Sequence, residues 1–358
     1  MRRVAWLALV LAACTRPADE RALQELAIGQ AESPDARVAV GGALAAVREL
    51  ADRRLVLRSQ APVLDIELVV KGDASAGEWE ITIANALPDA TLAVNGMTYT
   101  RDPGEHPTLA RFHVPLTPGP HALRLAPPDA GIEASYRVAA MADIQDALPE
   151  VDEVFAAINA VPDLRFVVAM GDITQRAEVE EFDLFDQQLA ILQIPFFTTL
   201  GNHELWGPPE RYFERYGRAS FQFDFKGAAF TFVDSGDAVL DPIVEGWLDD
   251  WLATARDRTH VFLTHFPPID PVGIRYGAMR NTTDAHRLLS RLAAGAVDLT
   301  LYGHIHTYAQ FENAGIPAYI SGGGGAQPMR GDGIDRHFLV IELGPAGIGP
   351  VEVQRVDD

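Results

Sequence analysis

The sequence predicts an α/β protein in which a layered sheet flanked by helices follows a small all-β domain. Apolar and polar residues alternate between turn residues over residues 36–136, which is the pattern of short half-buried strands. From residue 137 onward, apolar strands alternate with helix-like segments, as in layered α/β folds. The 358 residues, 48% of them hydrophobic, are enough for about two domains with buried cores.

The composition excludes several classes of function. Lysine and arginine number 29 against 50 aspartates and glutamates, so the net charge of −21 argues against a general nucleic-acid surface. An anionic substrate must therefore be attracted locally, by bound cations or by a few arginines. The single cysteine excludes an intramolecular disulfide framework, a cysteine-rich zinc site and an iron–sulfur cluster. No apolar run approaches the roughly 20 residues that span a bilayer, so an integral membrane protein is not expected.

The N-terminus has the plan of a secretory signal, in which two arginines precede an apolar stretch at residues 4–13. The tetrad Leu11-Ala12-Ala13-Cys14 resembles a bacterial lipobox. That resemblance implies a lipoprotein signal peptide at residues 1–13 and a lipid on the thiol of Cys14. The mature protein would then be extracytoplasmic and lipid-anchored to the bacterial cell envelope, with the outer membrane among the expected destinations. An ordinary signal peptide with a chance cysteine is the alternative.

The remainder of the chain divides into three parts. Residues 14–35 are polar and alanine-rich, so we predict a tether with at most one weak helix. Residues 36–136 are predicted to form a small β-sandwich domain that loosely resembles immunoglobulin-like modules, which describes a shape rather than a function. Its clearest alternating stretches are residues 63–70, 79–83 and 111–116. Residues 137–358 are predicted to form the α/β domain.

Five strands, four helices and one hairpin are expected in the α/β domain. The strands lie near residues 137–142, 166–170, 196–200, 261–264 and 299–302. The helical segments are residues 147–160, 177–193, 243–256 and 283–294, and the hairpin joins residues 221–225 to 229–234. In folds of this kind, functional side chains collect where strands end and loops begin.

Each of the five strands ends in side chains that can bind a metal ion. In chain order these are Asp143 and Gln145, Asp172, Asn202 and His203, His265, and His304 and His306. Carboxylate, amide and imidazole donors together suit Mn, Fe, Zn or Co. Glycines at 171, 201 and 303 fit strands that turn sharply with their backbone close to an ion.

Taken together and in this order, the motifs resemble the calcineurin-like metallophosphoesterase family over residues 137 to about 345. The resemblance implies a layered β-sandwich core flanked by helices, and two divalent metal ions (Mn, Fe, Zn or Co). One ion would be held by Asp143, Gln145, Asp172 and His306, and the other by Asp172, Asn202, His265 and His304. Asp172 would bridge them, since one carboxylate can span ions about 3.5–4 Å apart. A bridging water would attack phosphorus, and His203 would stabilise the transition state or protonate the leaving oxygen.

The chain departs from this family's pattern at two positions. Gln145 stands where the family usually has histidine, and a neutral amide oxygen is a weaker donor than imidazole. Gln175 stands where purple acid phosphatases carry the tyrosine responsible for their colour, so a colourless protein is expected. It also replaces the aspartate that often pairs with the catalytic histidine, and Glu204 or a backbone carbonyl could orient His203 instead. Arg176 is either a substrate-phosphate contact or a surface arginine that opens a helix.

Other features are assigned weaker roles. The run of four glycines at residues 322–325 lacks the Gly-Lys-Ser/Thr of a P-loop, so we predict a flexible loop beside the site. Trp206, Tyr212 and Phe213 could line a substrate wall, but core packing under a loop is favoured. The histidines outside the motifs are interpreted as structural; they are His106, His113, His121, His260, His286 and His337.

The sequence therefore predicts a hydrolase acting on phosphoric ester bonds, which cleaves a phosphomonoester or phosphodiester with water activated by a dinuclear metal centre. The alternative is a non-catalytic envelope lipoprotein on a decayed phosphoesterase fold, of which Gln145 would be a symptom. A metal-dependent amidase or peptidase ranks below both, because the chain lacks His-Glu-x-x-His.

Overall fold

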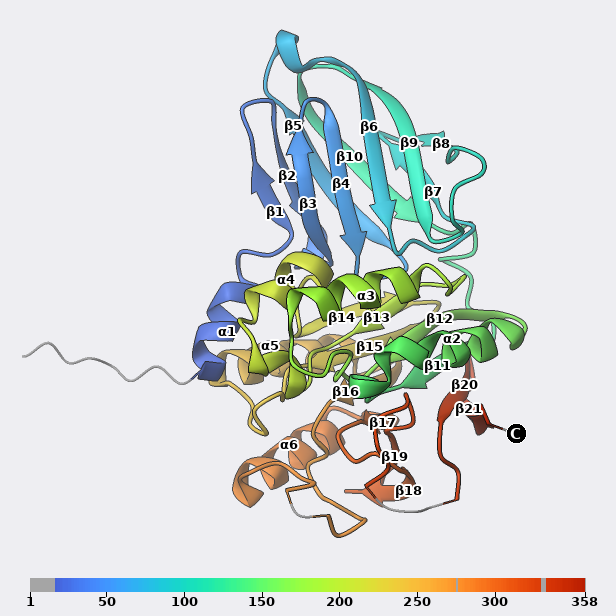
Figure 1. Cartoon of the computed structure of the whole chain (residues 1–358). Coiled ribbons are helices and arrows are strands. Elements are labelled where there is room, and N and C mark those ends of the chain that lie inside the picture. The colour runs from blue at the N-terminus through green and yellow to red at the C-terminus, as the bar shows by residue number, and fades with distance from the viewer. Residues whose placement is uncertain (1–16, 275, 330–332, 358) are drawn as a thin grey trace, which may run out of the picture.

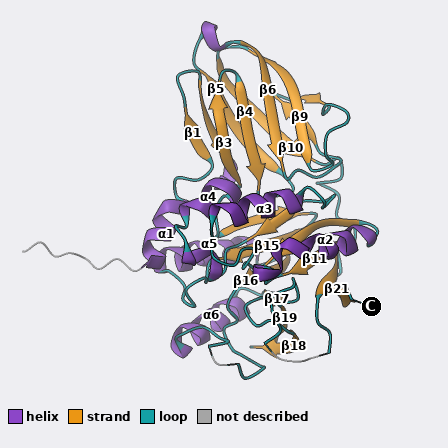
Figure 2. Cartoon of the chain, viewed as in Figure 1, coloured by secondary structure: helices purple, strands orange, loops and turns teal. Residues whose placement is uncertain are grey.

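The computed structural model describes residues 17–274, 276–329 and 333–357, and the structural statements below concern these residues. The predicted signal peptide and Cys14 lie outside them. An all-β part, the β-domain, stands on a mixed part, the α/β domain, as Figures 1 and 2 show. The predicted fold class is confirmed. No helix among the described residues has the length and apolar character needed to cross a membrane.

The β-domain is a sandwich of two sheets. One sheet has the order β1-β2-β5-β10-β7-β8 and the other β3-β4-β6-β9. The strands of the first sheet are β1 (Gln30–Glu32), β2 (Ala36–Val40), β5 (Leu64–Val70), β10 (Gly119–Ala126), β7 (Thr91–Val94) and β8 (Met97–Tyr99). The second sheet contains β3 (Ala45–Ala51), β4 (Arg54–Ser59), β6 (Gly77–Ala84) and β9 (Leu109–Leu116). Strand β5 shows the predicted alternation, because Leu64, Ile66 and Leu68 are buried while Asp65 and Glu67 face solvent.

The α/β domain contains two further sheets that face each other. The first sheet has the order β13-β12-β11-β20-β21, and its strands β11, β12 and β13 run parallel. The second has the order β14-β15-β16-β17-β19-β18, and its strands β15, β16, β17 and β19 run parallel. The first sheet contains β11 (Tyr136–Met141), β12 (Leu164–Ala169), β13 (Phe196–Thr198), β20 (His337–Gly344) and β21 (Gly347–Arg355). The second contains β14 (Phe221–Phe225), β15 (Ala228–Val233), β16 (Thr259–Thr264), β17 (Leu299–Tyr302), β18 (Tyr308–Asn313) and β19 (Ile316–Ser321).

Helices cover the outer face of each of these sheets, which gives a helix–sheet–sheet–helix sandwich. One apolar cluster joins the first sheet to α2 (Val151–Ala160), α3 (Val179–Leu189) and α4 (Glu210–Tyr216). Another joins the second sheet to α5 (Pro242–Ala255) and α6 (Thr282–Ala294). Between the sheets, the ring of Phe166 packs against Phe197, Phe223 and Phe230 with centroid separations of 5.4–5.8 Å.

Two side-chain amides join the β-domain to the α/β domain. Asn85 donates to the carbonyl oxygen of Phe196 at 3.0 Å and accepts from the N–H of Phe196 at 2.8 Å. Gln60 pairs in the same reciprocal way with the backbone of Arg218, at 2.6 and 2.7 Å. Asn85 therefore satisfies the backbone of β13, the edge strand of its sheet, as a further strand would.

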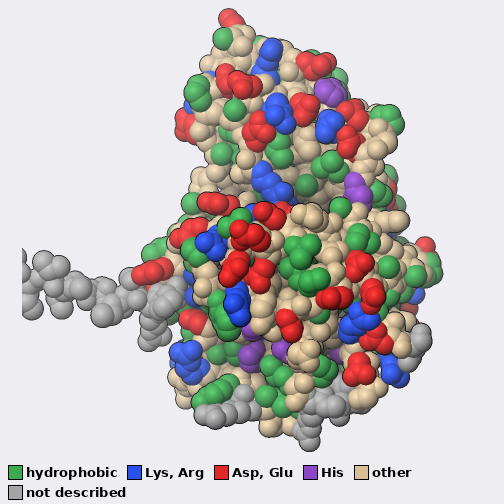
Figure 3. Space-filling model, in the orientation of Figure 1, with side chains coloured by type: hydrophobic (Ala, Val, Ile, Leu, Met, Phe, Trp, Pro, Cys, Tyr) green, Lys and Arg blue, Asp and Glu red, His purple; other side chains and the backbone are tan. Residues whose placement is uncertain are grey.

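Part of the predicted tether is folded instead. Helix α1 (Pro17–Glu25) packs on the α/β domain with Ala22 buried, and β1 pairs with β2. Arg21 forms ion pairs with Asp234 at 2.8 Å and with Asp237 at 3.0 Å. The sequence allowed a weak helix here but not its docking, because the buried face consists of alanines and charged residues whose partners lie 193 to 216 positions later. The face of the molecule shown in Figure 3 carries many acidic side chains on both domains, as the net charge of −21 requires.

Candidate metal centre

The side chains predicted to bind metal all come together where the strands end. Strands β11, β12 and β13 end beside Asp143, Asp172 and Asn202, and β16 and β17 end beside His265 and His304. The two sets of parallel strands belong to facing sheets, so their carboxyl ends meet at one edge of the sandwich. All seven predicted ligands, including Gln145 and His306, are connected there by the contacts described below.

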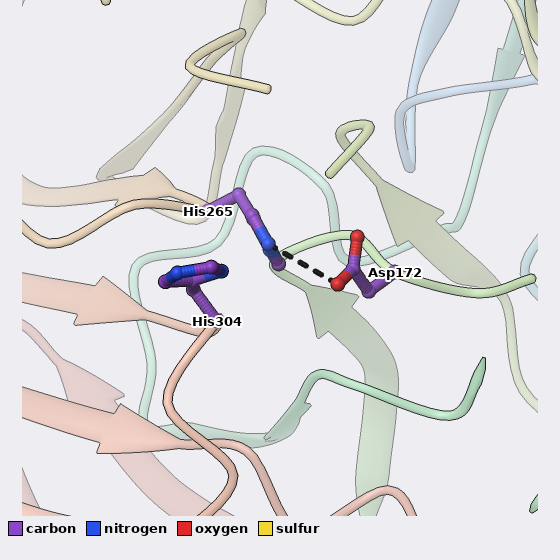
Figure 4. A group of neighbouring side chains, drawn as sticks. All are labelled: Asp172, His265 and His304. Atoms are coloured by element: carbon purple, nitrogen blue, oxygen red, sulfur yellow. Dashed lines mark ion pairs between the residues drawn. The ribbon is translucent and has the colours of Figure 1, made fainter. Parts of the chain in front are cut away.

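One group of possible ligands is formed by Asp172, His265 and His304, with one donor atom from each within 4.8 Å of the others. His265 points its Nε2 at Asp172 Oδ2, 3.3 Å away (Figure 4). Asn202 joins this group, because its Oδ1 lies 3.0 Å from His265 Nε2 and 3.0 Å from His304 Nδ1. A carboxylate, an amide oxygen and two imidazole nitrogens therefore converge on one point.

A second group consists of Asp143, Asp172 and His306, again with donor atoms within 4.8 Å of one another. His306 Nε2 lies 3.6 Å from Asp143 Oδ1. The side-chain amide of Gln145 lies 2.8 Å from Asp172 Oδ2 and 3.0 Å from His306 Nε2, so this residue occupies the position expected of a ligand. Its nitrogen faces the group, and a half-turn of the amide would present the oxygen to the same point. Asp172 is shared by both groups.

The backbone around these ligands is held in an uncommon conformation. Four of the site residues have positive φ angles: Asp143 at 64°, Gln145 at 48°, Asp172 at 54° and His304 at 69°. Non-glycine residues rarely adopt this left-handed region, which costs on the order of 1–3 kcal/mol at each position. Such strain persists only where the surrounding structure enforces it, and it is concentrated at functional sites.

Close approach of the backbone explains two of the glycines. A Cβ atom on Gly201 would overlap the carboxylate of Asp172, and one on Gly322 would overlap the carbonyl oxygen of Ile305. The prediction of a flexible glycine loop at residues 322–325 is therefore wrong. Gly322, Gly323 and Gly324 are buried, and the N–H of Gly324 donates to the carbonyl of Ala142 at 2.8 Å. The glycines allow this segment to pack directly against the turn that carries Asp143.

Each of the four site histidines donates one ring N–H to a backbone carbonyl. The pairs are His203 Nδ1 with Gln175 (2.6 Å), His265 Nδ1 with Met170 (2.6 Å), His304 Nε2 with Tyr276 (2.9 Å) and His306 Nδ1 with Gln327 (2.7 Å). A carbonyl accepts only from a protonated nitrogen, so these bonds fix the tautomer and leave the other nitrogen free to bind. Sequence reasoning could not find these carbonyls, because every residue has one.

The bond from His203 decides between the two predicted ways of orienting this ring. The carbonyl of Gln175 holds Nδ1, and Nε2 faces the site 4.0 Å from Asp172 Oδ2. Glu204 has a different role: its buried carboxylate accepts the N–H groups of Asp172 at 2.9 Å, Thr174 at 3.0 Å and Gly201 at 2.7 Å. Glu204 thus fastens together two of the turns that carry ligands, which the sequence did not indicate.

The aromatic residues after His203 have separate roles. Tyr212 and Phe213 are buried in the core, as favoured from the sequence. Trp206 is not: 62% of it is exposed, and its ring stacks on the His203 imidazole with centroids 4.9 Å apart. Arg176 is exposed near α3, and its guanidinium forms no ion pair with any residue that the structure describes.

Burial and mutual charge shift the acid–base properties of the site. Burial raises the pKa of Asp143 well above its usual value, and the nearby Asp172 carboxylate adds to this. Burial of His265 lowers its pKa, but the carboxylates of Asp172 and Asp143 outweigh this effect and raise the pKa to about 9. Burial, together with the charge on His265, lowers the pKa of His304 to about 3. Burial also lowers the pKa of His306, which favours the neutral imidazole that a metal ligand requires.

The donor set fits a divalent metal site. Asp143, Asp172 and Glu204 are all fully buried, yet no lysine or arginine pairs with them among the described residues. Burying a carboxylate is costly, and the raised pKa of Asp143 expresses that cost. Asp172 is compensated by imidazoles alone: despite burial, His265 and His203 hold its pKa below the usual value. A bound cation would supply the missing positive charge, and the mixture of carboxylate, amide and imidazole suits Mn, Fe, Zn or Co.

The chain was also compared with known proteins. Residues 136–308 match the calcineurin-like phosphoesterase family. The chain is 26% identical over 165 residues to a probable glycerophosphodiester phosphodiesterase GpdQ of Arcobacter nitrofigilis, and the match covers 41% of this chain and 59% of that relative. It is also similar to the structure of a purple acid phosphatase isolated from yellow lupin (Lupinus luteus) seeds, with a TM-score of 0.52 and 13% identity over 88% of this chain and 72% of that one. This last likeness concerns the fold alone.

Proposed function

We propose, from the match of residues 136–308 to the calcineurin-like phosphoesterase family, that the chain is a metal-dependent hydrolase that cleaves a phosphomonoester or phosphodiester. The observation that carries the proposal is the position of Asp172 in both groups of possible ligands. A shared carboxylate is what a pair of neighbouring cations requires. We therefore propose a dinuclear centre, in which Asp143, Gln145, Asp172 and His306 hold one ion and Asp172, Asn202, His265 and His304 hold the other.

When bound, two divalent ions would neutralise phosphoryl oxygens and lower the pKa of water enough to supply hydroxide near neutral pH. The residues of the chain have complementary tasks. The carbonyls of Met170, Tyr276 and Gln327 fix the tautomers of the three ligand histidines, so that their free nitrogens point to the centre. His203, whose Nε2 faces the site, would donate a proton to the leaving oxygen.

The placement of the protein also remains a proposal. The lipobox-like tetrad ending at Cys14 supports a lipid-anchored, extracytoplasmic protein. Two or three acyl chains would suffice for stable anchoring, because each buried methylene contributes about 0.8 kcal/mol. Intact-mass analysis of the mature N-terminus tests this: a lipidated Cys14 as the first residue is expected, and an unmodified Cys14 contradicts it.

The enzymatic proposal is tested with metal-depleted protein that is reloaded with Mn²⁺ or another divalent ion. Hydrolysis of p-nitrophenyl phosphate and bis(p-nitrophenyl) phosphate should appear only after reloading. The assay with bis(p-nitrophenyl) phosphate also tests for phosphodiesterase activity, for which the GpdQ relative is named. Failure of every divalent ion to support turnover on either ester would contradict the proposal and favour a non-catalytic lipoprotein.

A further inference from the structure

Three loops around the site present large apolar side chains to solvent. Trp206 is 62% exposed, Tyr276 is 75% exposed and Met329 is 40% exposed. Ile269, which follows His265 on its loop, is 43% exposed. Exposed single apolar residues are ordinary on protein surfaces, whereas several around one site point to contact with something apolar.

Each of the first three residues is attached to a different site histidine. The ring of Trp206 stacks on His203 at an interplanar angle of 17°. The carbonyl of Tyr276 accepts from His304 at 2.9 Å. The third attachment is the N–H of Met329, which donates to the carbonyl of His306 at 3.1 Å. We call Trp206, Tyr276 and Met329 the apolar rim. Figure 3 shows histidines in the lower half of the molecule with hydrophobic side chains beside them.

The rim and the interior of the site differ in chemistry. The interior offers carboxylates, an amide and imidazoles, which suit metal ions and the phosphoryl group that they attract. The rim offers two aromatic rings and a thioether, which form few hydrogen bonds with a small hydroxylated alcohol. One face of Trp206 is already covered by His203, and its exposed fraction leaves the rest of the ring open to a ligand. An aromatic or alkyl group that left water there would gain about 25 cal/mol per Å² of apolar surface buried.

We propose that the apolar rim binds the organic group of the substrate, so that the site prefers phosphoesters of aromatic or alkyl alcohols to those of small polar alcohols. This inference rests on the proposed phosphoesterase function. It assigns substrate choice to residues outside the metal ligands, on the loops that follow β13, β16 and β19.

The first test measures equilibrium binding, without turnover. Metal-loaded protein is titrated by calorimetry with methyl-, butyl- and phenylphosphonate, which share one anionic group and cannot be hydrolysed as esters. The Kd should fall roughly tenfold from methyl- to phenylphosphonate. Trp206→Ala and Tyr276→Ala should each remove most of this ratio, whereas Trp206→Phe should keep it. Met97→Ala, which alters a 63% exposed methionine on β8 of the β-domain, is the matched control and should keep the full ratio.

The second test is kinetic and keeps the leaving group constant. In p-nitrophenyl methyl, butyl and phenyl phosphodiesters only the other substituent changes, so kcat/KM should rise with its apolar size, mainly through a lower KM.

Turnover of all three esters at one rate, with equal Kd values for the phosphonates, would overturn the inference and leave the proposed function intact. Absence of both turnover and phosphonate binding would overturn the two together. Rim variants that lose binding to neutral phosphatidylcholine vesicles but keep the phosphonate ratio would assign the rim to a membrane surface instead, and so overturn it.

Discussion

The β-domain and the α/β domain are both sandwiches, yet they bury different side chains. Among the described residues of the β-domain no carboxylate is buried, and alternating apolar side chains fill its interior. The α/β domain buries Asp143, Asp172 and Glu204 at one edge of its sandwich. The comparison teaches that the α/β domain departs from an apolar interior where it gathers its possible metal ligands, whereas buried carboxylates elsewhere, such as Asp234 and Glu25, pair with arginines.

The same contrast applies to the polar contacts inside the molecule. Asn85 and Gln60 join the two domains with donor and acceptor both satisfied, so these amides contribute to stability. The site carboxylates instead lie beside one another, and the pKa of Asp143 is raised by burial first and by the neighbouring Asp172 carboxylate in addition. Substitutions should therefore separate into those that abolish turnover and those that weaken the fold.

The largest effect is expected from Asp172→Asn, which removes the charge shared by both groups of ligands. Turnover should fall by roughly 10³-fold or more, and the metal content measured by atomic emission should drop at both sites. Asp65→Asn on β5, which alters an exposed carboxylate of the β-domain, is the control and should retain activity. Wild-type turnover in Asp172→Asn would rule out this residue as the bridge.

Next in size is His203→Ala. Its Nε2 faces the site, and its Nδ1 donates to the carbonyl of Gln175. The bond from its backbone N–H to Asp172 Oδ1 is retained when the side chain is removed. The rate should fall by about 10²–10⁴-fold while the metal content stays near normal. His113→Ala on β9 serves as the matched histidine control. A metal loss as large as the loss of rate would instead identify His203 as a ligand or a structural residue.

Asn85→Ala should weaken the fold and spare catalysis. It leaves the N–H and C=O of Phe196 without their partner in a buried contact, at a cost of about 1–3 kcal/mol for each group. Urea denaturation should show this loss, while kcat of the metal-loaded protein stays constant. Asn159→Ala removes an amide with a similar pair of bonds at an exposed position, where water can replace it, and should cost less. Equal losses in the two variants would mean that burial at the domain contact adds nothing.

Glu25, a buried carboxylate outside the site, should make stability depend on pH. Burial raises its pKa to about 7 against the opposing charge of Arg218, while Asp234 adds to the shift. The folded state therefore holds this proton more tightly than the unfolded chain, whose pKa is near 4.5. The stabilisation is complete below that value and is lost as pH rises through about 7.

Glu25→Gln should accordingly gain stability relative to the wild type as pH rises, by up to ~3 kcal/mol above the folded pKa. Denaturation curves at a series of pH values measure this difference. Glu67→Gln, an exposed substitution on β5, should show a flat difference. If the difference in unfolding free energy between Glu25→Gln and the wild type also stayed constant with pH, the Glu25 carboxylate would be solvated in the folded protein.

The smallest effect is expected from Gln145→His, which restores the side chain usual in the family. Since Gln145 contacts Asp172 and His306, an imidazole there should tighten the first site or change its metal preference by roughly tenfold. Isothermal titration with Mn²⁺ and Zn²⁺ measures it. An unchanged titration would place Gln145 outside the set of ligands.

The sequence predicted the fold class and the meeting of the ligands because both depend on local patterns. Alternation marked strands such as β5, and each polar strand end, such as that of Asp172, lay where parallel strands of facing sheets converge. It allowed a weak helix at α1 but could not predict its packing on the α/β domain, because Arg21 finds its carboxylates 213 and 216 positions away. It mistook the segment at residues 322–325 for a flexible loop, because glycine serves close packing as well as flexibility.

The left-handed backbones of Asp143, Gln145, Asp172 and His304 have one more consequence. In small zinc-binding domains the ion itself organises the chain, and its removal unfolds the protein. Here the two sheets and the glycine segment at residues 322–325 hold the strained turns, so the binding site is formed before any ion binds. A chelator should empty such a cavity without collapsing it, and one cation can replace another without the protein having to refold.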